Sequence, residues 1–396
     1  MQIMPYKFKR AEVRRWVYDC PPIDYAYCGG FHLMLERFHV PVEDRVYVKQ
    51  EKMRAATETI FQKMGLTDDD AALSADVLML SDMRGCETHG VSNMLRQYVK
   101  GYNDGSIIAK PEVTTIRESP TTATMDGGGG LGLHTAPVAM NVAIEKAKKH
   151  GMASVSMRNS RHLGMAAYHA MMALEHDMIG LCMTGGGGSA GNFGMVPTFG
   201  TESRFGTNPI AWAAPADKMP PFVFDVATTQ VAGNKLMLAE RIGAKLEPGW
   251  ITDADGIPIM EPTDLPPFGE FKMLPFGGTR ENGSHKGYGF ASVVYILCQT
   301  LAGSGWDAPS GGGHHFMVYN IDAFTDVTKF KSDMDDFLEG LANTKPAPGH
   351  DEVVYAGLPE ARETEERTKN GIPYHREVID WFHSISGELD LGIQLP

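Results

Sequence analysis

The feature that most constrains the fold is a glycine cluster at residues 127–132, which satisfies the pattern G-x-G-x-x-G. A strand-like run at 121–125 precedes it and a helical pattern at 135–150 follows, which is the setting of a dinucleotide-binding Rossmann turn. The next strand-like run, 152–157, is followed by an arginine and an asparagine rather than by an acidic side chain for a ribose. We therefore predict a tight turn that needs glycine for its bend, and not a phosphate-binding loop.

Apolar periodicity predicts three helices before this turn. A stripe from Met53 to Met64 repeats at helical spacing and stops at Gly65, a residue suited to a helix end. Thr67 precedes three aspartates and is typical of an N-cap whose acidic first turn complements the helix dipole. We expect this second helix to end near Gly85, and a third helix to span about 91–103.

Strand and helix patterns alternate in the remainder of the chain. Glycine and proline separate the predicted elements, and a loop is expected at 304–313. Patterning alone therefore predicts an α/β protein with more than one subdomain. The predicted strands are 179–183, 209–214 and 222–225, and the predicted helices are 230–242, 288–301, 324–341 and 361–369.

Composition narrows the class of protein. The 396 residues carry a formal net charge of -13, which argues against nonspecific binding to nucleic acid or to an anionic membrane. The five cysteines are scattered along a long chain, which favours reduced thiols and a cytoplasmic location. We find no apolar run of the roughly 20 residues that a membrane span requires.

Residues 1–46 are the least readable part of the chain. Cys20, Cys28, His32 and His39 raise the question of a metal site, but their spacing does not match the compact cysteine pairs of zinc sites. We expect instead an extended arm that packs on a partner subunit, and no metal.

His89 is the first candidate for acid/base chemistry. It lies just beyond the predicted end of a helix, with Arg84, Glu87 and Arg96 nearby in sequence. Imidazole titrates near neutral pH, so a small environmental shift lets it donate or accept a proton. A structural histidine at a helix terminus is the competing interpretation.

Further motifs follow His89 in order along the chain. Together they resemble the malate/L-lactate dehydrogenase family of the non-Rossmann type, over about Val46 to Phe382. The resemblance implies reversible hydride transfer between NAD or NADP and a 2-hydroxy acid or a related 2-oxo or imino acid, in a homodimer. The motifs are Asp82-x-Arg84-Gly85-x-x-Thr88-His89-Gly90, Arg158-Asn159-Ser160-x-His162-x-Gly164, Phe205–Pro209, Phe224–Thr229, Leu274-Pro275 and Lys286–Gly289.

The same resemblance implies the fold and its division. We expect a non-Rossmann α/β fold with a helical portion formed from both chain ends and a cofactor domain on a mixed, largely antiparallel sheet. The helical, substrate-binding and dimerisation portion would comprise 47–120 and 310–396, and the cofactor domain 121–309. Residues 1–46 would be an extension of unknown role.

Cofactor binding is expected from several loops. The glycine-rich stretch that begins at Thr184 follows a strand and can present backbone N–H groups to an anion. Other segments match parts of the family that approach the dinucleotide, although Ala356 stands where the family has proline. The predicted cofactor-binding residues are Thr184, Gly186, Asp225, Val226, Ala227, Thr228, His285, Lys286, Gly357 and Leu358.

Both histidine motifs of the family are present. We predict His89 as the acid/base and His162 as the group that polarises or positions the same substrate oxygen. Thr88 replaces the usual serine and keeps its hydroxyl. Asn93 stands where the family has an arginine for the substrate carboxylate, so either Arg96 takes that role or the substrate is not a simple 2-hydroxy acid.

Two other functions remain open at this point. A metal-dependent hydrolase or lyase would use His89 and His162, although no H-E-x-x-H spacing supports it. A binding protein that has lost activity is the second alternative, motivated by Asn93 and the unusual glycine loop.

Overall fold

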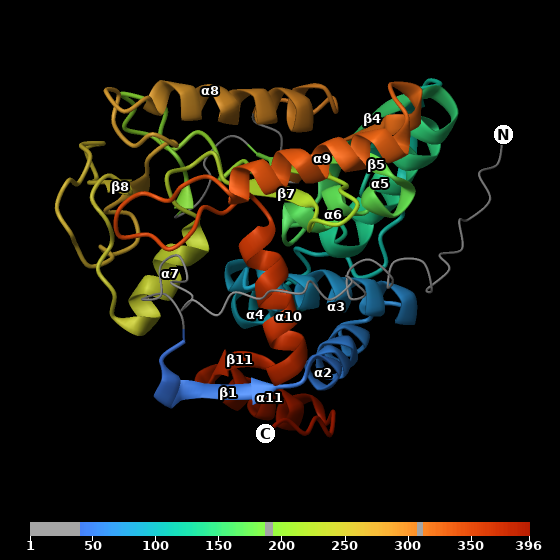
Figure 1. Ribbon diagram of the computed structural model, residues 1–396. Coiled ribbons are helices and arrows are strands. Elements are labelled where there is room, and N and C mark those ends of the chain that lie inside the picture. Colours follow the sequence, from blue (N-terminus) through green and yellow to red (C-terminus); the bar gives the residue numbers. More distant parts are fainter. Residues whose placement is uncertain (1–39, 187–192, 307–311) are drawn as a thin grey trace.

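A seven-stranded mixed sheet forms the upper part of the molecule in the computed structural model, which describes residues 40–186, 193–306 and 312–396 (Figure 1). The strand order is β2-β3-β4-β10-β5-β6-β7. β3 and β4 run parallel, and every other neighbouring pair in this sheet is antiparallel. This confirms the predicted mixed, largely antiparallel sheet. The predicted arm, its cysteines and histidines up to His39, and the glycine loop at 187–192 lie outside the described residues.

The elements of the described residues have the following bounds. The strands are β1 (Arg45–Val48), β2 (Thr114–Glu118), β3 (Thr122–Asp126), β4 (Met152–Ser160), β5 (Met178–Gly185), β6 (Ile210–Ala214), β7 (Phe222–Val226), β8 (Ile251–Thr252), β9 (Lys272–Met273), β10 (Gly312–Asn320) and β11 (Ile372–His375). The helices are α2 (Gln50–Lys63), α3 (Asp68–Met83), α4 (Val91–Asn103), α5 (Gly132–His150), α6 (Ala166–Met171), α7 (Gly233–Ile242), α8 (Ser284–Tyr295) with its π-helical continuation η6 (Ile296–Thr300), α9 (Val327–Ala342), α10 (Leu358–Asn370) and α11 (Arg376–Leu389). None of the described helices is both long and apolar enough to cross a bilayer.

Helices pack on both faces of the sheet. α5 contacts β4 and β10, α6 contacts β5 and β6, and α8 with η6 contacts β5, β10 and β4. Two glycines of β5 permit this close packing: a Cβ on Gly180 would lie 2.1 Å from the Ala170 carbonyl oxygen, and a Cβ on Gly185 would lie 2.8 Å from the Val294 side chain. Because their positions differ by an odd number, the two glycines face opposite sides of the strand, with α6 on one side and α8 on the other.

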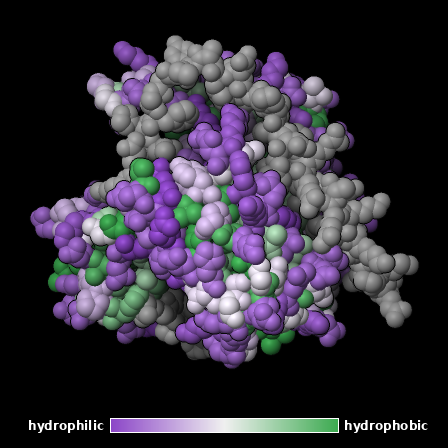
Figure 2. Space-filling model, turned by 90° about the horizontal axis from the view of Figure 1, so that it is seen from below, coloured by the Kyte–Doolittle hydropathy of each residue, from purple (hydrophilic) through white to green (hydrophobic). Residues whose placement is uncertain are grey.

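The two ends of the described chain meet in the lower part of the molecule. β1 pairs with β11 in antiparallel register, with Val46 opposite Tyr374, and Figure 1 shows the two strands side by side. α10 packs against α3 and α11 against β1 and β11. The predicted helical portion built from both chain ends is therefore confirmed. Seen from below, hydrophilic residues dominate the described surface, with smaller groups of hydrophobic residues between them (Figure 2).

The glycine cluster is a tight turn between β3 and α5. Gly128 and Gly129 have φ values of 62° and 75°, a backbone region that favours glycine. A Cβ on Gly132 would lie 2.6 Å from the Arg161 carbonyl oxygen. The glycines therefore bring this turn against the segment that follows β4, and that segment carries His162.

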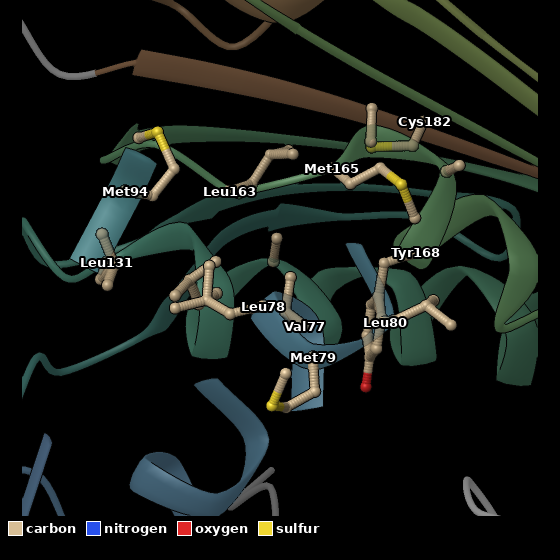
Figure 3. Packing of buried hydrophobic residues seen from close by; sticks show 14 of the residues in the cluster. Val77, Leu78, Met79, Leu80, Met94, Leu131, Leu163, Met165, Tyr168 and Cys182 are labelled. Carbon is tan, nitrogen blue, oxygen red and sulfur yellow. The ribbon is translucent and has the colours of Figure 1, made fainter. Parts of the chain in front are cut away.

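The same segment is fixed by the hydrophobic core. Leu163 and Met165 are buried in one cluster with Val77 and Leu78 of α3, and Figure 3 shows these side chains close together. At the start of α3 the predicted cap is present, because the Thr67 hydroxyl accepts a hydrogen bond from the Asp70 backbone N–H at 3.2 Å. α3 and the segment after β4 are thus held against one another, and each leads into one histidine motif.

Candidate active site

Both predicted histidines line one cavity of about 500 Å³. Its walls come from the turn after α3, the segment between β4 and α6, strand β7, the start of α7 and the start of α10. These elements are far apart in sequence, and the packing of α3 against α5, α6 and α10 helps to bring them together. The structure thus places His89 and His162 at one site.

The turn that carries His89 is fixed by the buried carboxyl group of Asp82. Its Oδ2 accepts hydrogen bonds from the Val91 backbone N–H at 3.0 Å and from the Tyr374 hydroxyl at 2.7 Å. The Asp82 carbonyl accepts a third bond from Arg367 at 2.6 Å. Burial raises the pKa of Asp82 to about 7. Groups of α10 and β11 therefore hold the turn of His89 from inside the protein.

His89 lies in a short 3-10 turn, Glu87–His89, and is half-buried. Its Nδ1 lies 2.9 Å from the Thr88 hydroxyl. The Thr88 carbonyl in turn accepts a hydrogen bond from the side chain of Asn234 in α7. Burial lowers the pKa of His89 to about 4, so the ring is neutral at pH 7 and able to accept a proton.

The tautomer of His162 follows from its partners. Nδ1 lies 3.2 Å from the Gly164 backbone N–H, which can only donate, so Nδ1 is an acceptor. The Tyr98 hydroxyl, 2.7 Å from the same atom, must then donate as well. In the neutral ring the proton therefore lies on Nε2, and His162 is a hydrogen-bond donor.

The two imidazoles are arranged as a pair. Their ring centroids are 5.7 Å apart and the planes differ by 10°. The His162 ring is open to the cavity but lies deep in the protein, and this burial, together with the nearby His89, lowers the pKa of His162 to about 3. Both rings are neutral at pH 7, and the charge repulsion between them favours the protonation of only one at a time.

Two buried histidines hold the backbone on either side of His162. His314 donates from Nε2 to the Arg161 carbonyl at 3.1 Å, and His169 donates from Nε2 to the Leu163 carbonyl at 2.9 Å. On the other side of its ring, His314 Nδ1 lies 2.8 Å from the Thr184 hydroxyl. His314 therefore links the predicted cofactor-binding residue Thr184 to the segment of His162.

Replacing His314 by phenylalanine should lower turnover by about 10- to 100-fold, because His162 loses one of its backbone supports and small misplacements of a reacting group are costly. His315→Phe is the matched control. That ring is equally buried but bonds to Ser154 and Ser156 instead. Steady-state kinetics and thermal melting of both variants separate the two effects. Similar losses of stability with unequal losses of turnover are expected, and equal losses of turnover would contradict a positioning role for His314.

Other predicted residues also reach the cavity. Thr88, Asp225 and Ala227 are among its lining residues. Asp225 Oδ2 accepts a hydrogen bond from the Ala167 backbone N–H at 2.7 Å, and burial raises the pKa of the Asp225 carboxyl to about 6. β7 therefore presents to the cavity a carboxyl group that is partly protonated near neutral pH.

Neither candidate for a carboxylate grip on α4 lines the cavity. The Asn93 side chain donates to the Glu87 carbonyl at 2.6 Å and so supports the catalytic turn. The Arg96 guanidinium pairs with Glu377 at 2.7 Å and lies over the ring of Trp381. With Arg96 engaged in this way by α11, the structure does not bring it to the histidines.

The remaining predicted cofactor residues lie around the cavity rather than in its lining. The Thr228 hydroxyl lies 3.0 Å from two backbone carbonyl oxygens, and the Gly186 N–H donates to the Asn208 side chain at 3.3 Å. Gly357 has a φ of 100° and packs its backbone against the start of β7. Val226 ends β7, Leu358 is buried at the start of α10, and His285 and Lys286 are exposed in the first turn of α8.

Sequence reasoning did not find several residues of the site. Tyr98 belongs to none of the motifs that we used, although its spacing of one turn from Met94 places both residues on the side of α4 that meets His162 and the cavity. Asn234 and His314 belong to no motif that we used, so nothing in the sequence pointed to them. Among the described residues, no group of three or more His, Cys, Asp or Glu side chains is arranged to hold a metal ion.

Comparison with known proteins identifies the family. A family profile described as malate/L-lactate dehydrogenase matches residues 48–382. Malate dehydrogenase of Pyrococcus abyssi is 36% identical over 362 residues, which span 89% of this chain and 97% of that protein. L-Sulfolactate dehydrogenase of Methanocaldococcus jannaschii is 32% identical over 357 residues, which span 88% of this chain and 98% of that protein.

Solved structures agree with the sequence comparison. The crystal structure of malate dehydrogenase from Entamoeba histolytica has a TM-score of 0.82 at 31% identity and covers 89% of this chain and 99% of its own. The resemblance inferred from the ordered motifs is thereby confirmed. The chain belongs to the malate/L-lactate dehydrogenase family and is an oxidoreductase that acts on hydroxy acids.

Proposed function

We propose that the protein transfers a hydride between a nicotinamide cofactor, NAD or NADP, and the hydroxyl-bearing carbon of a small 2-hydroxy acid, and so interconverts that acid with its 2-oxo form. The observation that carries the proposal is the pair of neutral imidazoles that line one cavity 5.7 Å apart. Relatives named for malate and sulfolactate, both 2-hydroxy acids, support this substrate class. A related imino acid is a second candidate for the oxidised partner.

The two histidines divide the proton chemistry. With Nδ1 occupied by two donors, His162 offers its Nε2–H to the substrate oxygen and polarises it. His89 has only the Thr88 hydroxyl at Nδ1, and a hydroxyl accepts as readily as it donates, so Nε2 of His89 is free to act as the base. During oxidation the substrate hydroxyl proton goes to His89, and during reduction His89 returns it. Thr88 then stabilises the protonated ring.

The surroundings of the cavity fit a dinucleotide. A nicotinamide bound there would accept or supply the hydride. A Cβ at Gly186 would have no described atom within 4 Å, so the backbone at this one glycine leaves room for an approaching ligand. Asp225 faces the cavity with a carboxyl group suited to hydroxyl or amide donors. We assign cofactor contacts to these two residues and to Thr184, Val226, Ala227, Thr228, His285, Lys286, Gly357 and Leu358.

An absorbance assay tests the proposal. The purified protein is incubated with NADH or NADPH and a panel of 2-oxo acids, with and without a metal chelator. We expect loss of the reduced cofactor with at least one 2-oxo acid, insensitive to the chelator. Turnover that the chelator abolishes would favour the metal-dependent alternative, and no turnover with either cofactor would favour a binding protein.

A second copy of this chain is the partner we propose, and α8 supplies the supporting surface. Phe290 and Val293 of α8, Ile296 of η6 and Leu301, which directly follows η6, are between 46% and 57% exposed, an unusual density of apolar side chains for a free surface. Light scattering should give a mass twice that of one chain. Phe290→Asp should lower the measured mass towards that of a single chain, because the charge disrupts the apolar contact. The same change at Phe337 of α9, also 52% exposed, is the control and should leave the mass unaltered.

The predicted division into 47–120 with 310–396 and 121–309 is retained as a proposal for the substrate and cofactor portions. The sheet itself draws on both, because β10 lies between β4 and β5. A reducing, cytoplasmic location is also proposed. It is supported by Cys86, Cys182 and Cys298, which are free thiols in the structure.

A further inference from the structure

Arg84 is a buried cation that faces the cavity. It follows α3, is 7% exposed, and lines the same cavity as the two histidines. In the described parts of the chain its guanidinium has no hydrogen bond or ion pair. Arg96 and Arg367, in contrast, are both bound to glutamates. A buried arginine that has no partner is costly, and an anionic ligand would remove that cost.

The charges around Arg84 leave room for such an anion. Glu87 also lines the cavity, but it is neutralised by Arg367 at 2.8 Å. Arg84 and Glu360 both act electrostatically on Asp225, yet no ion pair joins Arg84 to either carboxylate in the described residues. Lys235, the other cation of the lining, has an interaction of its own. Arg84 is therefore the lining cation, within the described residues, whose donors are available.

The position of Arg84 suits a substrate contact. It precedes His89 by five residues in the turn that Asp82 fixes, so the cation and the base belong to one rigid unit. A guanidinium binds a carboxylate through two parallel hydrogen bonds and so orients it. In a 2-hydroxy acid the carboxylate is attached directly to the reacting carbon. A grip on that group would bring the hydroxyl to the histidines.

We propose that Arg84 binds the substrate carboxylate and is the residue that selects 2-hydroxy and 2-oxo carboxylates, in the place that Asn93 leaves vacant. The proposal rests on the proposed function for the identity of the reacting acid. It assigns to Asn93 and Arg96 structural contacts with Glu87 and Glu377 instead of a substrate contact.

The test uses binding as well as turnover. Oxamate, an unreactive analogue of a 2-oxo acid, is titrated into the wild type, Arg84→Met, Arg84→Lys and Arg96→Met by calorimetry. We expect Arg84→Met to weaken oxamate binding by about 100-fold, the usual consequence of removing one member of a buried charged pair. Arg84→Lys keeps the positive charge but cannot form the two parallel hydrogen bonds of a guanidinium, so its affinity for oxamate should fall by about 10-fold. Arg96→Met is the matched control and should bind like the wild type.

Kinetics with a 2-oxo acid and with its amide give an independent readout. Arg84→Met should raise the KM of the acid far more than that of the amide, with a smaller change in kcat. Undiminished oxamate binding by Arg84→Met, or a loss confined to Arg96→Met, would overturn the proposal. If Arg84→Met does not fold, Arg84→Lys provides the test. Wild-type affinity of Arg84→Lys for oxamate would exclude a bidentate contact between Arg84 and the carboxylate. Oxamate binding at Arg84 without any turnover would leave this site standing and remove only the proposed reaction.

Discussion

His89→Ala is expected to reduce turnover by about 10²–10⁴-fold, the usual contribution of a positioned acid/base. The ring lies opposite His162 in the cavity and is the imidazole whose Nε2 is free to take the substrate proton. Affinity for the cofactor should change little, since the proposed role of His89 is to exchange a proton with the substrate and not to bind the cofactor. Single-turnover and steady-state rates with a saturating hydroxy acid measure the loss. His350→Ala, at an exposed position outside the cavity, is the control.

The pH dependence of the rate of hydroxy-acid oxidation tests the assignment of His89 as the base in a second way. Burial lowers the pKa of His89 to about 4, so the ring is neutral and competent above that pH and protonated below it. The rate of oxidation should therefore fall as pH drops through about 4, well below the 6.5 of an ordinary histidine. An unchanged profile and turnover in His89→Ala would show that His89 is structural.

Gly90→Ala should destabilise the protein by about 3 kcal/mol and abolish most activity, at the upper end of overpacking effects. The added Cβ would lie 1.7 Å from Asp82 Oδ1, so the buried carboxyl and the backbone of the turn must separate. That movement breaks the bonds of Asp82 to Val91 and Tyr374 and shifts His89. Thermal and denaturant unfolding measure the loss of stability. Activity assays at temperatures below the unfolding transition measure the loss of turnover.

Gly340→Ala is the control for this substitution. Gly340 lies near the end of α9 with no atom within 4 Å of an added Cβ, so alanine there should stabilise the helix by about 0.5–1 kcal/mol. If Gly90→Ala and Gly340→Ala have similar stability and activity, the Asp82 side chain and the backbone of the turn move aside at little cost. In that case the fixed geometry of the catalytic turn is not what sets activity.

Local signals predicted the helices well, because their causes are local. The Thr67 cap, the stop at Gly65 and the third helix at Val91–Asn103 all follow from residues within one or two turns. β10 was missed, although it is a central strand. It begins with two glycines and two histidines and has no alternating pattern, because β4 and β5 flank it and helices cover both faces. Its strand character depends on neighbours more than a hundred residues away.

The candidate site also combines residues that local motifs predict with residues whose placement depends on distant parts of the chain. His89 and His162 were predicted from their motifs, and the structure brings them together. Arg96 was one of the two possibilities that Asn93 left open, because it lies one turn away on the same helix, but its direction is set by Glu377, 281 residues further along the chain. The supports from Tyr374 to Asp82 and from His314 to the segment of His162 are also long-range pairs. No single sequence encodes such pairs in a readable pattern.

The pairing of β1 with β11 has a consequence for the folding of the chain during its synthesis on the ribosome. Asp82 receives Arg367 and Tyr374 only after nearly 300 further residues have been made, and the partner of β1 among the described strands is complete only when Ile372–His375 emerge. Domains fold during synthesis from the N-terminus onward. The turn of His89 therefore lacks these bonds until Arg367 and Tyr374 have been synthesised. A nascent or prematurely terminated chain ending before Tyr374 would carry both histidines and no working site.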